Sequence, residues 1–264
     1  MPIALPWRRP RLPVIELHGI LAAREGALNI TAVRPLIERA FHTQRRGGHV
    51  VLDINSPGGS AVQSDLIASL IRRRAESSGV SVHAVIGDVG ASGGYWLACA
   101  ADRILANPMS IVGSIGVVGG GFGFVELIQR LGIERRAYVA GKNKLRLDPF
   151  RPERAEDVAF TEALLADIHA RFKAWVRLRR GTRLAAEEEH WADGSFMLAE
   201  QAQALGLIDG FADVDGLVEE LAGPRARALR LRPRRRWFLR RLPRVLVEAI
   251  LDAAETHSLG VTLR

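Results

Sequence analysis

Hydrophobic and polar positions divide the first part of the chain into strand-like and helix-like segments. Residues 14–21 and 49–60 begin with apolar, β-branched runs that are typical of buried strands, and residues 80–95 open with a third such run. Amphipathic spacing over 30–43 and 61–77 predicts helices after the first two runs. Strand, glycine-rich turn and helix follow one another twice, which predicts a parallel α/β fold.

The second part of the chain is predicted to be less regular. Residues 103–121 indicate short strands broken by turns, and 124–133 a short helix. Residues 137–150 indicate a strand that leads into a loop. A long amphipathic helix is expected over 151–181, because its acidic first half and basic end match the helix dipole. Residues 196–223 predict a short helix, a strand and a further helix.

Positive charge is concentrated near the C-terminus. The segment from Arg225 to Arg244 holds ten arginines and no acidic residue, so removing it takes the formal net charge from +8 to −2. We therefore expect a lead-in at 1–13, a catalytic domain at 14–223 and a basic amphipathic tail at 224–264. A nearly neutral body argues against nucleic acid as the main partner, and a non-catalytic scaffold or nucleic-acid-binding protein that acts through the tail is an alternative.

The tail and the cysteine content bear on location. Arginines beside Trp237, Phe238 and Leu239 predict a segment that can contact an anionic membrane surface, and a solvated or inter-subunit tail is the alternative. No run of 18 apolar residues and no cleaved signal is visible. Cys99 is the single cysteine, so no intramolecular disulfide forms and no cysteine cluster can hold a metal. We expect a cytoplasmic protein, peripheral at the membrane if the tail binds there, with no cofactor.

Two glycine-rich turns carry the chemistry. GASGGY at 90–95 places Ser92 between a strand and a helix, where its hydroxyl could attack a carbonyl and Gly93 N–H could stabilise an oxyanion. A helix-capping serine is the alternative. NSPGG at 55–59 ends the preceding strand, and the carboxyl ends of parallel strands line one crevice. Gly58 or Gly59 could supply a second N–H, although a simple turn after Pro57 gives the same pattern.

A nucleophilic serine needs a base, and the histidines are poorly placed for that role. His18 and His83 lie within predicted strands, His169 within the long helix and His257 in the tail. His190, in a polar segment, is the best placed of them. A serine–histidine triad is therefore the weaker expectation.

Lysine usage points to another base. Only Lys142, Lys144 and Lys173 are lysines, and the other 34 of the 37 basic side chains are arginines. Arginine keeps its proton near neutral pH, whereas a lysine in a desolvated pocket can have its pKa lowered enough to accept one. Two of the three lysines share the sequence GKNK, which as a solvated loop would carry no function.

Several motifs in order resemble the signal peptide peptidase A and SohB family of serine peptidases, over about residues 14–215. They are NSPGG (55–59), GASGGY (90–95), AADRILANP (100–108), VGSIGV (112–117), AGKNK (140–144) followed by PF (149–150), and ADG with AEQAQALGLID (192–209). The resemblance implies the fold shared by Clp protease and the crotonases, with repeated strand-turn-helix units and mostly parallel sheets.

The resemblance also implies roles for individual residues. Ser92 would be the nucleophile and Lys144, largely buried, the general base. Ser114 would hold the lysine by a hydrogen bond. Lys144 is preferred to Lys142 because it matches the family's position before the PF sequence, 52 residues after Ser92.

The oxyanion hole implied by the resemblance consists of Gly93 and Gly59 N–H groups, with Gly58 as the substitute for the second. Substrates would be signal peptides or other unfolded or membrane-derived peptides, and the active form a homo-oligomer. A crotonase-type acyl-CoA enzyme is the alternative on the same fold, since it uses similar N–H groups without Ser92 or Lys144.

Overall fold

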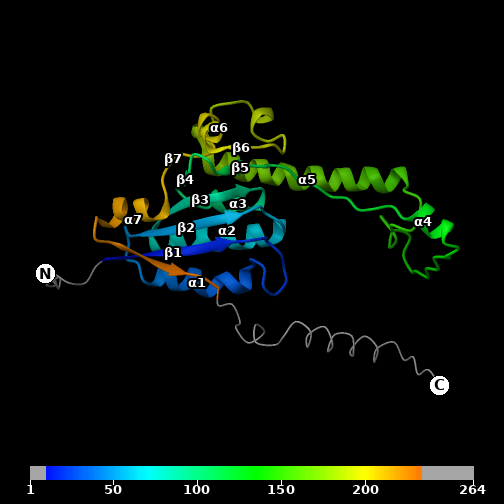
Figure 1. The fold of residues 1–264 in the computed structure, drawn as a ribbon, viewed down its shortest axis with the longest axis horizontal. Helices are drawn as coiled ribbons and strands as arrows, with labels where there is room; N and C mark the ends of the chain where they lie inside the picture. The colour runs from blue at the N-terminus through cyan, green and yellow to red at the C-terminus, as the bar shows by residue number, and fades with distance from the viewer. Residues whose placement is uncertain (1–9, 234–264) are drawn as a thin grey trace, which may run out of the picture. The chain divides into compact units, whose positions relative to one another are not determined.

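A mostly parallel β-sheet runs through residues 10–233, the part of the chain that the computed structural model describes (Figure 1). Its strands are β1 (Arg11–His18), β2 (His49–Ser56), β3 (Ser81–Ala91), β4 (Arg103–Ala106), β5 (Ile111–Gly113), β6 (Phe196–Leu198), β7 (Gly210–Phe211) and β8 (Arg227–Leu231). They lie in the order β6-β5-β3-β2-β1-β8, and β4 pairs with β3 and β7. Within this range only the β5–β6 pair is antiparallel. The sheet confirms the mostly parallel α/β class.

The helices connect these strands. They are α1 (Ile30–His42), α2 (Ala61–Ser78), α3 (Gly93–Ala98), α4 (Val125–Arg130), α5 (Ala155–Arg180), α6 (Ala199–Ala204) and α7 (Val214–Ala222), with 3-10 turns at Gly181–Arg183 and Glu188–His190. Local chemistry sets several of their ends: Asn29 accepts a hydrogen bond from Ala32 N–H at the start of α1, and Gly79 ends α2 in a left-handed conformation.

The two faces of the sheet are buried in different cores. Successive strand residues point to opposite faces, so in β2 Leu52 and Ile54 belong to a large core with α1, α2 and α3, whereas Val51 belongs to a smaller core with α7. Because both faces are covered near the middle of the sheet, β2 reads as an almost continuous apolar run.

The basic region predicted to start at residue 224 first contributes β8. Arg227–Leu231 pairs in parallel with β1, Leu229 and Leu231 pack on the large core, and Arg230 Nη1 lies 3.1 Å from Asp53 Oδ2. The strand forms because its leucine side chains are buried against the core, while Arg230 forms an ion pair with Asp53. Residues 234–264, on which the helical and membrane-binding expectations rest, and residues 1–9 lie outside the described residues.

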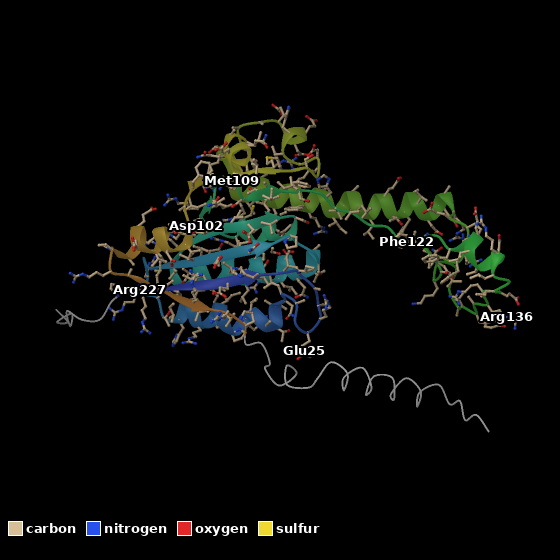
Figure 2. The ribbon with its side chains drawn as sticks, viewed as in Figure 1. Glu25, Asp102, Met109, Phe122, Arg136 and Arg227 are labelled. Atoms are coloured by element: carbon tan, nitrogen blue, oxygen red, sulfur yellow. The ribbon has the colours of Figure 1, made fainter. Side chains whose placement is uncertain are left out.

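Residues 117–154, which we call the arm, extend away from the sheet to α4 and return to the start of α5 (Figure 1). The arm holds no strand, so the strand predicted within 137–150 is wrong, and turns occupy 140–150 instead. Figure 2 shows Phe122 and Arg136 on the arm, well separated from Asp102 and Arg227 on the body. The C-terminal half of α5 packs on the body, where Trp175 Nε1 donates to Trp96 O at 3.1 Å.

Candidate active site

Ser92 lies at the junction of β3 and α3 in a conformation that serine rarely adopts. Its φ of 51° and ψ of −122° fall in a region that favours glycine. Two backbone hydrogen bonds hold it there: Ser92 N–H donates to Gly113 O at 2.8 Å, and Ser92 O accepts from Trp96 N–H at 3.0 Å. The side chain makes no capping bond to α3. The helix-cap alternative therefore does not explain this serine, and its hydroxyl is available for chemistry.

The NSPGG turn packs directly against the serine. A methyl group at Gly58 would lie 2.7 Å from both Gly93 N and Ser92 Cβ, so only a glycine allows this approach. On its other side the turn is bound to the segment after β1: Leu21 N–H donates to Gly58 O at 2.9 Å, and Ser60 N–H donates to Leu21 O at 2.8 Å. The two glycine turns thus meet at the carboxyl ends of β2 and β3.

Two backbone donors remain unused beside Ser92. In the described part of the chain, Gly59 N–H and Gly93 N–H have no hydrogen-bond acceptor. Gly58 N–H, by contrast, donates to Ser56 Oγ at 3.2 Å and is not available for an oxyanion. Gly93 is free because the first N–H groups of a helix have no partner within the helix.

Ser92 and both unused donors open onto a cavity of about 940 Å³. The wall combines apolar side chains with six polar or ionisable ones. Its lining side chains and glycines are Pro57, Gly59, Ala61, Ser64, Ser92, Gly93, Trp96, Ser114, Gly116, Val117, Val118, Ile168, His169, Phe172, Asp193, Gly194, Ser195 and Phe196. A serine hydroxyl, two free N–H groups and apolar side chains in one cavity suit the binding and acylation of a peptide.

Ser114, the predicted lysine-orienting residue, also lines this cavity. Its φ is 51°, and its N–H donates to Ser195 O at 2.6 Å. The same hydrogen bond joins the end of β5 to the segment that leads into β6. Ser92, Gly93, Gly59 and Ser114 are therefore brought together by the fold.

Two ionisable side chains in the cavity were given no role by the sequence interpretation, which set His169 aside as part of the long helix and named Asp193 only within a motif. His169, on α5, has its Nε2 atom 3.0 Å from Ile115 O. Asp193 accepts hydrogen bonds from Ser195 N–H and Ser195 Oγ, both at 2.9 Å, and these bonds lower the pKa of its carboxyl group. No hydrogen bond joins Ser92, His169 and Asp193 to one another among the described residues, so they do not form an assembled triad.

Lys144 is not at the site in the single chain. It lies with Lys142 on an exposed turn of the arm, where Lys144 N–H donates to Gly141 O at 3.1 Å, and neither lysine lines the cavity. A largely buried Lys144 was expected, and here the side chain is exposed. The difference arises because residues 140–150 form turns at the far end of the arm, away from the sheet (Figure 1).

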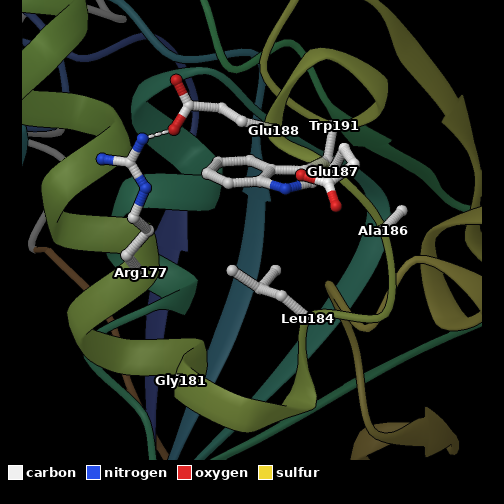
Figure 3. Close-up of a pocket in the computed structure, with 7 residues that line it drawn as sticks. All are labelled: Arg177, Gly181, Leu184, Ala186, Glu187, Glu188 and Trp191. Carbon is white, nitrogen blue, oxygen red and sulfur yellow. Dashed lines mark ion pairs between the residues drawn. The ribbon is translucent and has the colours of Figure 1, made fainter.

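The third lysine pairs with a residue that lines a different pocket. Lys173 Nζ lies 2.7 Å from Glu188 Oε1, and Arg177 pairs with the same carboxylate. Figure 3 shows Arg177 directed toward Glu188, beside the ring of Trp191, in a pocket of about 510 Å³. This pocket is lined by Arg177, Gly181, Leu184, Ala186, Glu187, Glu188 and Trp191, none of which is an acyl-transfer nucleophile of the serine or cysteine type.

The described residues, 10–233, also lack two other kinds of functional feature. No group of three or more histidine, cysteine, aspartate or glutamate side chains is arranged to hold a metal ion. No helix in this range combines the length and the apolar composition needed to cross a membrane.

Comparison with known proteins places the chain among peptidases. The model of peptidase family S49 matches residues 74–227. A protein of Brucella abortus named Na(+)/H(+) antiporter NhaA is 41% identical over 236 residues, which are 88% of this chain and 32% of that protein. A putative protease of Synechocystis, slr0021, is 29% identical over 202 residues, which are 76% of this chain and 69% of that protein.

The chloroplastic serine protease SPPA of Arabidopsis thaliana is 30% identical over 230 residues, which are 83% of this chain and 33% of that protein. The chain thus spans about a third of the Brucella and Arabidopsis relatives and about two thirds of the Synechocystis one.

Proposed function

Because the chain belongs to peptidase family S49, we propose that it is a serine endopeptidase in which Ser92 attacks the peptide carbonyl and Lys144 accepts the serine proton. The observation that carries the proposal is the state of Ser92: a strained, uncapped serine beside two unused N–H groups in a cavity that also has apolar side chains. Strain of this kind persists only where the surrounding structure imposes it, and it is common at active sites.

The reaction proceeds by acyl transfer. Ser92 Oγ adds to the carbonyl carbon while its proton passes to the neutral lysine amine, and the carbonyl oxygen becomes an oxyanion. Gly59 and Gly93 N–H groups donate to that oxygen. The tetrahedral intermediate then collapses, the lysine returns the proton to the departing amine, and an acyl-enzyme forms on Ser92. Water, deprotonated by the same lysine, releases the acyl group and restores the hydroxyl.

We infer that Lys144 reaches Ser92 from a neighbouring copy of the chain. Within one chain the cavity lacks a lysine, while the arm presents Lys144 on its surface. The arm also exposes large apolar side chains: Val118 is 95% exposed, Phe122 80% and Tyr138 92%. Apolar surface of this kind marks protein–protein contacts, and contact with a second body would remove the lysine from water. The predicted homo-oligomer would then be a requirement for activity.

The cavity supports unfolded peptides as substrates. Trp96, Phe172 and Phe196 offer apolar contacts to side chains, and an extended backbone fits beside the NSPGG turn more readily than a folded surface does. Signal peptides and other membrane-derived peptides have this character, and we propose them as the natural substrate class.

The decisive measurement is hydrolysis of a fluorogenic, apolar peptide by the wild type and single variants. Ser92→Ala and Lys144→Ala should each lower kcat by about 10⁴-fold or more, as expected when members of a nucleophile–base unit are removed. Lys142→Ala is the matched control on the same turn and should stay within about 2-fold of the wild type, which is no more than about 0.4 kcal/mol. Ser92→Ala protein as active as the wild type would overturn the proposal.

His169 provides a competing base because it lines the same cavity. His169→Ala should retain most of kcat if the lysine is the base. A loss equal to that of Ser92→Ala, with Lys144→Ala active, would instead establish a serine–histidine mechanism.

Mixing two inactive variants tests the origin of the lysine. Ser92→Ala and Lys144→Ala proteins, unfolded together and refolded, should regain activity, because some contacts then pair an intact serine with an intact lysine from another copy. A mixture as inactive as its parents, at a concentration where the wild type is oligomeric, would show that both residues act within one chain.

A further inference from the structure

We propose that Ser56 is a positioning residue that aims the oxyanion-binding N–H of Gly59, an inference that rests on the proposed peptidase function. Ser56 ends β2, is fully buried, and lies one residue before Pro57 of the cavity wall. It does not line the cavity, so it acts on the substrate only through the backbone that it holds.

The Ser56 hydroxyl is bonded on both sides. Its Oγ donates to Gly19 O at 2.7 Å and accepts from Gly58 N–H at 3.2 Å. Gly19 N–H in turn donates to Asn55 O at 2.9 Å. One side chain therefore joins the segment that follows β1 to the NSPGG turn, and it occupies the only N–H of the Gly-Gly pair that is not directed into the cavity.

The direction of Gly59 N–H follows from the planarity of the peptide unit. In a trans peptide the C=O of one residue and the N–H of the next point in opposite directions. Gly58 C=O is held toward Leu21 N–H at 2.9 Å, so Gly59 N–H points away from Leu21, and Gly59 lines the cavity beside Ser92. Ser56 fixes the peptide before this one by binding Gly58 N–H. With this peptide held by Leu21 and the peptide before it held by Ser56, the orientation of Gly59 N–H is determined.

Ser56 also supports the serine side of the site. Its backbone pairs with Gly90 at an irregularity in the β2–β3 ladder, and its carbonyl oxygen is so close to Gly94 that an added methyl group there would lie 2.3 Å away. The residue thus contacts the start of the NSPGG turn and the first turn of α3. A change at Ser56 shifts the two oxyanion donors relative to each other.

Ser56→Ala leaves Gly58 N–H and Gly19 O without their partner and frees the turn to rotate. We expect kcat to fall by about 10- to 100-fold with KM changed by less than about 3-fold, because an interaction made in the transition state is lost. Ser56→Cys, which keeps a weaker donor and acceptor in the same place, should fall between alanine and the wild type.

A pair of inhibitors separates positioning from general destabilisation. A peptide boronate forms a tetrahedral adduct with the serine and places an oxygen in the oxyanion hole, whereas the amine product of the cleavage, which carries no carbonyl for that hole, reports binding of the side chains. Ser56→Ala should weaken boronate binding about as much as it lowers kcat/KM and leave the product affinity within about 3-fold.

Ser110 supplies a matched control, because it is also buried, donates to Ile86 O at 3.1 Å and accepts from Asn107 N–H at 3.1 Å, away from the NSPGG turn. Ser110→Ala should lower the melting temperature and leave the ratio of boronate to product affinity unchanged.

If Ser56→Ala weakened boronate and product binding equally, so that the ratio of the two affinities stayed at its wild-type value, the positioning role of Ser56 would be overturned. The proposed function would still stand in that case, provided that hydrolysis depended on Ser92. If Ser92→Ala itself hydrolysed the peptide normally, the proposed function would fail and the role of Ser56 with it. Should Ser56→Ala not fold, the same comparison on Ser56→Cys decides the matter.

Discussion

The close contact between the two glycine turns makes Gly58→Ala the most informative single substitution. The added methyl group would lie 2.7 Å from Gly93 N and from Ser92 Cβ and 3.0 Å from Ala91 O. Two of these atoms belong to the backbone, so no flexible side chain can move aside. Gly58 also has a φ of 99°, a conformation that alanine adopts only with strain.

Two separate effects should follow. Strain at positive φ costs about 1–3 kcal/mol, which for a domain of this size lowers the melting temperature by roughly 2–4 °C for each kcal/mol. Relief of the contact pushes Gly93 N–H out of line with the oxyanion, and the loss of one such donor lowers kcat by about 10²- to 10³-fold. The catalytic effect should therefore greatly exceed what the loss of folded protein explains.

Gly223→Ala is the matched control. Gly223 has a φ of 92°, and a methyl group there would meet no atom within 4 Å, so this variant carries the strain without the contact. Both variants are assayed for kcat and KM on the fluorogenic peptide and for melting temperature by calorimetry. Gly58→Ala with the kcat of Gly223→Ala would refute the packing of the NSPGG turn against Ser92 and, with it, the assignment of the oxyanion hole.

Three further outcomes are expected. The pKa of His83 is lowered to about 4, mainly by burial and then by the charges of His49 and Arg103. As the pH falls from 6.5 to 4, the unfolded chain therefore binds a proton at this histidine before the folded chain does. The melting temperature should fall over this range, and His83→Gln should flatten the dependence. Asp209→Asn leaves the buried Arg180 guanidinium without its carboxylate and should lower the unfolding free energy by about 3–5 kcal/mol, measured as a shifted urea midpoint. Asp193→Asn keeps an oxygen that can accept from Ser195 N–H but removes the negative charge from the cavity. It should lower the ratio of kcat/KM for lysine-bearing peptides to that for glutamate-bearing peptides by about 5-fold, whereas an unchanged ratio would exclude contact between Asp193 and the charged side chain of the substrate.

The parts of the fold that local chemistry determines were predictable from the sequence. Buried strands such as β2 can be recognised by their runs of apolar residues, here Val50, Val51, Leu52 and Ile54, and the glycine turns after the strands mark the carboxyl ends where Ser92 lies. Charge was a poorer guide at the C-terminus, because the arginine-rich run hides β8: Arg230 can enter the sheet only because Asp53, distant in the sequence, meets it there.

His169 shows why the rest of the cavity was missed. Its neighbours Ile168 and Phe172 share one side of α5, so helical spacing could have suggested an inward-facing histidine. The spacing does not show what the helix packs against. His169 reaches Ile115 O because the helix crosses the body, and this contact joins residues 54 positions apart in the sequence. Neither glycine nor proline near His169 marks it as part of a site.

Lys144 could not be placed from the sequence because its position depends on the arm rather than on any nearby pattern. The arm holds its own shape: buried Asp157 at the start of α5 pairs with Arg146 and Arg154, and Phe124 contacts Phe150. These contacts lie within the arm and at the start of α5, while the arm's large apolar side chains are exposed. A site divided in this way would be complete only after assembly. An isolated chain would then carry a nucleophile and an oxyanion hole without a base, which would restrict hydrolysis to the assembled protein.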